Sequence, residues 1–207
     1  MRFYVISDTH DHHRDLPFDE DADGIIHCGD FSHGPLSEED FLQWFSELPF
    51  KYKILVAGNH DESPEKDLEG FKQKCHLLGV TYLQDSGIEI EGVKFWGSPW
   101  TPTFGPFSFM DDDMELEKYW QLIPDDTNVL ITHGPAYGVL DKARSPLNLG
   151  SKTLASRMHS LMNLKYHLFG HIHESWGEEQ NTYRIINACS FNPYKRNLNR
   201  PRLILID

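Results

Sequence analysis

Short apolar segments recur along the chain and alternate with segments of helical periodicity. The apolar segments are rich in valine, isoleucine, leucine and aromatic residues, and several are apolar at consecutive positions. Such runs are typical of strands buried on both faces of a sheet. We predict nine strands, over residues 2–7, 24–28, 51–57, 81–84, 93–97, 128–132, 166–169, 183–188 and 201–207.

Four segments between these strands carry apolar residues at helical spacing. We predict helices over residues 37–48, 65–78, 113–123 and 151–163. At the start of the first, Ser37 is followed three residues later by the acidic Asp40, which is typical of a helix that begins at a capping serine. The mixture of strands and helices favours a layered α/β fold with strands in the middle and helices outside.

Five of the predicted strands end in aspartate, asparagine or histidine, three of them through a glycine. The sequences at these ends are DTH at 8–10, GD at 29–30, GNHD at 58–61, HGP at 133–135 and GHIH at 170–173. Ligands of open α/β sheets gather at the carboxyl ends of the strands, so the polar ends converge in one cleft if these strands share a sheet. In extended backbone, His171 and His173 point the same way.

The polar residues at these ends have the chemistry of metal ligands. Seven are candidates: Asp8, His10, Asp30, Asn59, His133, His171 and His173. Carboxylate, amide and imidazole without thiolate suit manganese, iron, zinc or nickel, and seven ligands fit two divalent ions that share a carboxylate. Because only two of the seven are anionic, two such ions leave the cleft about two charges positive. A negatively charged phosphate ester is therefore the expected ligand of this cleft.

Length, charge and cysteine content narrow the class of protein. A chain of 207 residues predicts one domain over residues 1–207. The net charge of −13 argues against strong binding to a nucleic-acid duplex or to an anionic membrane. Apolar runs are too short for a signal peptide or a membrane span, so we expect a cytoplasmic protein. The three cysteines are expected to be reduced and buried, and oligomeric state stays open.

The ordered motifs DxH, GD, GNHD, HGP and GHxH resemble the calcineurin-like metallophosphoesterase superfamily over residues 8–173. The resemblance implies a four-layer αββα sandwich of two mixed β-sheets flanked by helices, with the site at the strand ends. The passages DTHDHHRDL, GSPWTPTF and GHIHESWG are also similar to small metallophosphoesterase-domain proteins that are regarded as class III-like cyclic nucleotide phosphodiesterases.

The resemblance also implies a role for each matching residue. Asp8, His10 and His173 bind the first metal, Asp30 bridges both ions, and Asn59, His133 and His171 bind the second. His60 contacts the phosphate together with Asn59 and protonates the leaving oxygen, and Asp61 orients His60. The alternatives are that His60 is an ordinary loop histidine and that Asp61 caps a helix or lies on the surface. Manganese is the ion expected to activate the enzyme.

The residues after the GD motif predict the kind of ester. Protein serine/threonine phosphatases carry an arginine there that grips a phosphomonoester, whereas this chain continues as FSHGP and offers only His33. We therefore predict a phosphodiesterase, acting on a cyclic nucleotide or similar small diester by attack of a metal-bridging hydroxide, with His33 touching the phosphate. The alternatives are a phosphomonoesterase or nuclease on the same ions, or a non-catalytic nucleotide-binding module.

Two further segments each allow two interpretations. The loop over residues 97–110 holds Trp100, Phe104, Phe107 and Phe109. These rings could form a stacking wall for a nucleobase, but we expect them to pack the loop against the body of the protein. His12 could reach the cleft, but we expect it to lie in a solvated loop.

Overall fold

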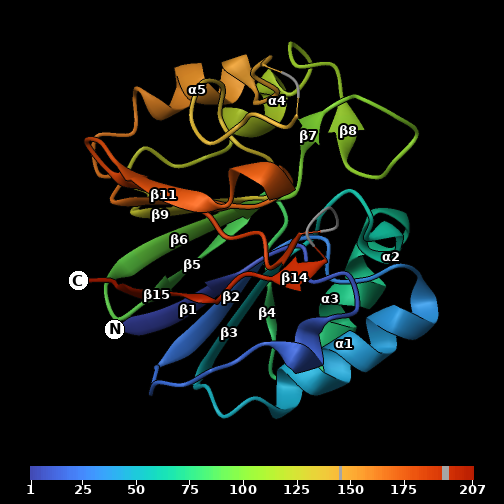
Figure 1. The fold of residues 1–207 in the computed structure, drawn as a ribbon. Helices are drawn as coiled ribbons and strands as arrows, with labels where there is room; N and C mark the ends of the chain where they lie inside the picture. The colour runs from blue at the N-terminus through green and yellow to red at the C-terminus, as the bar shows by residue number, and fades with distance from the viewer. Residues whose placement is uncertain (145, 193–195) are drawn as a thin grey trace.

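Two β-sheets lie face to face at the centre of the computed structural model, which describes residues 1–144, 146–192 and 196–207 (Figure 1). All nine predicted strands are present. They are β1 (Arg2–Ile6), β2 (Gly24–Cys28), β3 (Tyr52–Val56), β4 (Thr81–Tyr82), β6 (Val93–Ser98), β9 (Val129–Thr132), β10 (Tyr166–Phe169), β12 (Arg184–Asn187) and β15 (Arg202–Leu205).

Each sheet has a parallel centre and at least one antiparallel edge. The first sheet has the order β15-β1-β2-β3-β4, in which β1 to β4 are parallel and β15 is antiparallel. The second has the order β11-β12-β10-β9-β6-β5, in which β12, β10, β9 and β6 are parallel. Its antiparallel edges, β5 (Ser86–Ile90) and β11 (Gly177–Gln180), were not predicted. Both contain exposed polar residues and lack a continuous apolar run, because edge strands contact the core less.

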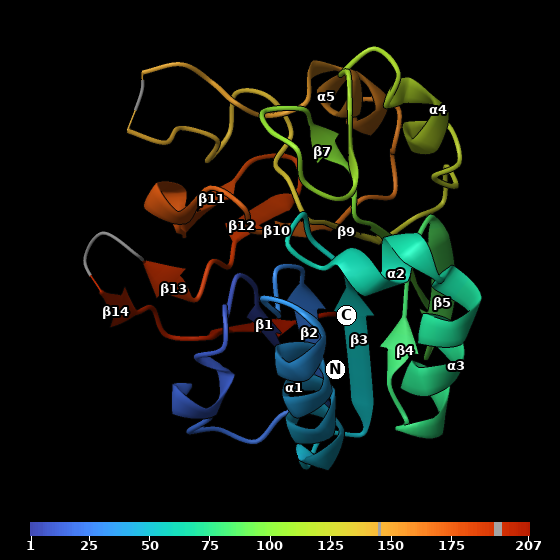
Figure 2. The same ribbon diagram turned by 90° about the vertical axis from the view of Figure 1, so that its right-hand side faces the viewer.

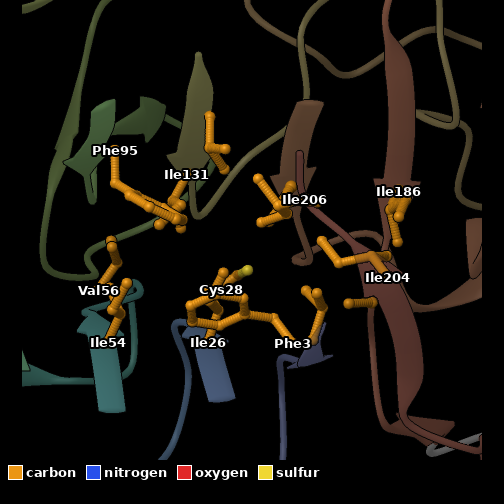
Figure 3. Close-up of a cluster of buried hydrophobic side chains, with 14 of the residues drawn as sticks. Phe3, Ile26, Cys28, Ile54, Val56, Phe95, Ile131, Ile186, Ile204 and Ile206 are labelled. Carbon is orange, nitrogen blue, oxygen red and sulfur yellow. The ribbon is translucent and has the colours of Figure 1, made fainter. Parts of the chain in front are cut away.

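Apolar side chains fill the space between the two sheets. Phe3, Ile26 and Ile54 from the first sheet face Phe95 and Ile131 from the second (Figure 3). These side chains are at most 2% exposed. Burial of this apolar surface stabilises the packing of the two sheets against each other. The same packing sets the relative positions of the loops at the sheet edges.

Helices cover the outer face of each sheet, as Figure 2 shows. The first sheet packs against α1 (Pro35–Glu47) and α3 (Leu68–Leu77), which is preceded by α2 (Glu62–Lys66). The second sheet packs against α4 (Glu117–Trp120) and α5 (Lys152–Met158). The four-layer αββα sandwich is therefore confirmed. No helix among the described residues is long and apolar enough to cross a membrane.

The predicted helix boundaries need four corrections. Helix α1 begins at Pro35, and Ser37 is not its cap, because the Ser37 hydroxyl accepts from His33 N and donates to Asp11. The segment 65–78 is divided at Asp67, whose carboxylate caps α3 by accepting from the backbone N of Gly70. The predictions over 113–123 and 151–163 are too long, since turns and irregular backbone occupy most of their remaining residues.

Short elements connect the layers near the strand ends. They are the 3-10 helices η1 (His13–Asp15) and η2 (His173–Ser175), and two small sheets, β7 (Thr101–Pro102) with β8 (Met110–Asp111) and β13 (Phe191–Asn192) with β14 (Asn197–Leu198).

Candidate metal centre

The five polar strand ends meet, although they belong to two sheets. Strands β1, β2 and β3 lie in the first sheet, whereas β9 and β10 lie in the second, in agreement with the two mixed sheets that the family resemblance implied. The carboxyl ends of both parallel sets open at the same edge of the sandwich. Asp30 after β2 lies 3.4 Å from His133 after β9, measured from Oδ1 to Nε2. The core between the sheets therefore places the two sets of loops opposite each other.

Three of the seven candidate ligands form one compact group. Asp8, His10 and His173 each offer a ligand atom, and these atoms lie within 4.8 Å of one another. His173 Nε2 is 3.2 Å from Asp8 Oδ1 and 3.4 Å from His10 Nε2. One carboxylate and two imidazoles at this spacing can hold a divalent ion.

A second group shares Asp8 and adds Asp30 and His133, again within 4.8 Å. Asn59 joins it, because Asn59 Oδ1 is 2.9 Å from His133 Nε2. Asp30 directs one oxygen toward each group, with Oδ2 at 3.8 Å from His10 Nε2 and Oδ1 at 3.4 Å from His133. This orientation suits a carboxylate shared by two ions, although Asp8 also belongs to both groups.

The last candidate, His171, borders the second group. Its ring centre lies 4.9 Å from that of His133, and its backbone N donates to Asp8 Oδ2 at 2.9 Å. The structure thus brings all seven candidates to one place.

Backbone strain concentrates at these residues. Asp8, His10, Asp30 and His171 have φ angles of 50°, 42°, 58° and 67°, in the left-handed region that non-glycine residues rarely adopt. Each such residue costs about 1–3 kcal/mol and persists where surrounding contacts impose it. Such strain is common at functional sites, because it aims side chains where regular strand geometry would not.

Two glycines make room for the carboxylates. A Cβ on Gly58 would lie 2.3 Å from Asp30 Oδ1, and one on Gly170 would lie 2.0 Å from Asp8 Oδ2. Neither distance is possible for a real side chain, so glycine at these two strand ends is required by the close approach of backbone to carboxylate.

Burial and charge set the protonation of the ligands. Burial lowers the pKa of His10 to about 4 and that of His171 to about 3, which leaves both imidazoles neutral near pH 7. Burial alone would raise the pKa of Asp8, but the charge of His173 holds it well below the usual value. Asp30 keeps a lowered pKa in the same way beside His133. Ionised carboxylates and neutral imidazoles are the forms that bind metal.

His133 and His173 behave differently from the other two imidazoles. Burial lowers the pKa of His133, but the charge of Asp30 outweighs it and raises the value to about 9. The pKa of His173 is raised beside Asp8 for the same reason. Protons on these two rings offset the charge of the buried carboxylates, and a bound divalent ion would replace those protons.

Unpartnered buried atoms test whether a metal fits. Within the described residues, Asp8 Oδ1, His10 Nδ1 and His173 Nδ1 are buried and make no aligned hydrogen bond. Buried polar atoms normally have partners, and all three of these residues belong to the first group. The donor types and the spacing of the ligand atoms fit divalent metal ions.

The hydrogen bonds of Asp61 differ from those that its predicted role, the orientation of His60, requires. Its fully buried carboxylate accepts from the backbone N of Gly58, Asp30, Phe31 and Ser32 at 2.8–3.4 Å, and from the Ser32 hydroxyl at 3.0 Å. Its hydrogen bonds go to these loops rather than to the His60 ring. We therefore propose that Asp61 positions Asp30 by holding the loop after β2.

Asp61→Asn tests this positioning role. We expect a loss of about 1–3 kcal/mol in the free energy of unfolding, because an amide NH₂ would face backbone N–H donors that now share a carboxylate. Urea unfolding followed by circular dichroism measures it. Asp67→Asn is the matched control, since asparagine caps helices as well as aspartate does. Unchanged stability with selectively slower release of poor leaving groups would support the orienting role instead.

His60 and His33 lie over the two ligand groups. His60 is 35% exposed, its backbone N donates to Asp30 Oδ1 at 2.8 Å, and its Nε2 lies 4.0 Å from Asp30 Oδ2. The His33 ring stacks on that of His10 at 4.7 Å and meets His60 edge-on at 5.5 Å. Both imidazoles therefore border the same cavity as His10 and His173.

The four aromatic residues of the loop over residues 97–110 fall into two pairs, one packed against the protein and one exposed. Phe109 is buried, and Trp100 stacks on Tyr119 at 3.9 Å between ring centres, so these rings pin the loop as expected. Phe104 and Phe107 are instead 60% and 41% exposed, and lie 5.3 Å from His171 and 5.0 Å from His60. The expectation of packing alone is wrong for this second pair.

Sequence reasoning missed two contacts of the centre. The buried thiol of Cys189 donates to Asp8 Oδ2 at 3.2 Å, which together with His171 N holds this oxygen, while Oδ1 faces His173. Cys189 follows β12 as the predicted ligands follow their strands, and that position was the available signal. His12 lies in a loop with a side chain 45% exposed, as expected, but it also stacks on Phe191 at 4.4 Å and borders a cavity beside the ligand groups.

Comparison with known proteins agrees with this geometry. Residues 1–175 match the family model of calcineurin-like phosphoesterases. Metal-dependent phosphoesterases are thus the class that the fold and the site define. The chain belongs to the calcineurin-like phosphoesterase family, which implies divalent ions at a dinuclear site and a phosphate-ester substrate.

Similar proteins occur in animals. The chain is 35% identical over 223 residues to the UPF0046 protein K07C11.7 of Caenorhabditis elegans, covering 100% of this chain and 75% of that protein. It is 32% identical to the human metallophosphoesterase domain-containing protein 1, covering 92% and 67%. The structure of the phosphopantetheinyl hydrolase PptH from Mycobacterium tuberculosis superposes with a TM-score of 0.66 at 16% identity, covering 99% and 96%, and supports the fold.

Proposed function

We propose that this metal-dependent phosphoesterase hydrolyses small phosphodiesters, with cyclic nucleotides among the candidates. The observation that carries the proposal is the lining of the cavity of about 750 Å³ above the ligand groups. Histidines, apolar side chains and two acidic residues line it, and none of its described lining residues is arginine or lysine. A dianionic monoester needs an additional cationic side chain for its second negative charge, and these lining residues supply neither arginine nor lysine. A monoanionic diester carries one charge less and does not need that side chain.

Two divalent ions are the cofactors of this proposal. Asp8, His10 and His173 would hold one, Asn59, His133 and His171 the other, and Asp30 would contact both. Such ions lower the pKa of a bound water and offset the charge of the phosphate. The donor types admit manganese, iron, zinc or nickel, and we propose manganese as the activating ion.

The remaining chemistry belongs to side chains of the chain. His60, partly exposed beside Asp30, donates a proton to the leaving oxygen, and His33 and Asn59 contact the other phosphate oxygens. Held in place by neighbouring rings, these groups need little reorganisation when charge develops on the phosphate.

The experiment compares two esters with one leaving group. Metal-stripped protein is resupplied with manganese, zinc, iron or nickel and given methyl 4-nitrophenyl phosphate or 4-nitrophenyl phosphate. We expect metal-dependent release of nitrophenol and a higher kcat/KM for the diester after correction for the uncatalysed rates. A higher value for the monoester would contradict the diester preference and favour a phosphomonoesterase. Bound metal without hydrolysis of either ester would favour a nucleotide-binding module.

A further inference from the structure

Two grooves with different linings meet at the candidate centre. The first, the metal-side groove, has a volume of about 750 Å³ and is bordered by His10, His173, Leu149 and Phe191. The second, the His60-side groove, has a volume of about 580 Å³ and is bordered by Lys66, Pro106 and Ser108. His33 and His60 border both, so the grooves meet where the phosphate is proposed to bind.

An aromatic ridge separates the two grooves. Phe104 lines the metal-side groove, Phe107 lines the His60-side groove, and their ring centres are 5.3 Å apart. Gly105 permits this arrangement, because a Cβ there would lie 2.7 Å from the Phe107 ring. Both rings are exposed on one loop beside the polar centre, where they can contact a ligand in either groove.

The walls of the grooves differ in chemistry. The metal-side groove carries Phe104, Leu149 and the stacked pair of His12 and Phe191, whose rings are 25° from parallel. This wall suits a planar or apolar group. The His60-side groove carries the ion pair of Lys66 with Glu62, which suits a polar group.

We infer that the substrate is a linear phosphodiester that lies across both grooves. The retained substituent occupies the metal-side groove, and the leaving alcohol occupies the His60-side groove, next to the proposed acid His60. A linear diester extends in two directions from phosphorus, whereas the two ester oxygens of a cyclic diester belong to one ring that fills one groove. This inference rests on the proposed function and narrows its substrate class.

The reaction balances on this placement. The oxygen of water forms a new bond to phosphorus while the bond between phosphorus and the leaving oxygen breaks. The leaving oxygen takes a proton from His60, and water supplies the proton that restores His60. The products are one alcohol, released from the His60-side groove, and one phosphomonoester of the retained substituent.

The experiment uses the metal-loaded protein with methyl 4-nitrophenyl phosphate and phenyl 4-nitrophenyl phosphate, which share a leaving group. We expect Phe104→Ala and Leu149→Ala to lower kcat/KM about fivefold for the phenyl diester and less than about twofold for the methyl diester. Phe107→Ala should lower both by the same factor. Met162→Ala is the control, because Met162 is 87% exposed and borders neither groove.

Three results would overturn the inference. Phe104→Ala could lower both diesters equally, Phe107→Ala could act on the phenyl diester alone, or a 3′,5′-cyclic nucleotide could be hydrolysed faster than both linear diesters and stay unaffected by either variant. In each case hydrolysis of the methyl diester by wild type leaves the proposed function standing. If the wild type with bound metal hydrolyses no diester, the proposed function and this inference fail together.

Discussion

Asp30→Asn is expected to empty at least one of the two proposed metal positions and to lower diester hydrolysis at least a hundredfold. The two oxygens of Asp30 face His10 and His133, so this side chain lies between the two ligand groups. Mutation of a residue that only orients a metal ligand typically changes metal affinity or activity by about 10–100-fold. Mutation of a direct ligand should have at least as large an effect. Asparagine keeps the shape and the oxygen that accepts from His60 N, and removes the charge.

Metal content after dialysis, measured by inductively coupled plasma mass spectrometry, checks this expectation independently of activity. The matched control is Asp40→Asn on α1, whose carboxylate pairs with Arg14 at the surface and faces neither ligand group. A variant at Asp30 that retains two equivalents of metal and the wild-type rate would show that Asp30 does not bridge the ions. Asp8, which belongs to both groups, would then be the candidate bridge.

His60→Ala is expected to slow diesters with alkyl leaving groups about 10²–10⁴-fold and 4-nitrophenyl diesters far less. General acid catalysis contributes on this scale where the departing alkoxide is basic, and 4-nitrophenolate leaves without a proton. A plot of log kcat against the pKa of the leaving alcohol should therefore be steeper for the variant. Metal content should stay at the wild-type level, because His60 belongs to neither ligand group.

His76→Ala on α3 is the control for removing an exposed imidazole. Equal losses for alkyl and aryl leaving groups would contradict the role of His60 as an acid and leave it a phosphate contact. Loss of metal with loss of rate would instead place His60 among the residues that shape the centre.

Local sequence determined much of the fold, because the strongest signals were short and continuous. Runs such as GIIHC and NVLIT are apolar at consecutive positions, and each became a central strand that both layers bury. The edge strand β11 reads GEEQ, and hydrogen bonds to β12 rather than apolar burial make it a strand. The segment 65–78 ended as two helices because Asp67 satisfies the first turn of α3 more directly than a continued helix would.

The chemistry of the candidate centre was also visible in the sequence, as polar residues placed where buried strands end. Which atoms meet was decided by the tertiary structure. Asp8 accepts from Cys189, which is 181 positions away, and the Asp61 carboxylate holds a loop about 30 positions earlier instead of its neighbour His60. Apolar periodicity selects strands and helices within one segment, whereas packing of the two sheets sets the contacts between segments. For this reason the sequence alone determined the kinds of candidate ligand, and only the packed sandwich decided their pairing and the two grooves beside them.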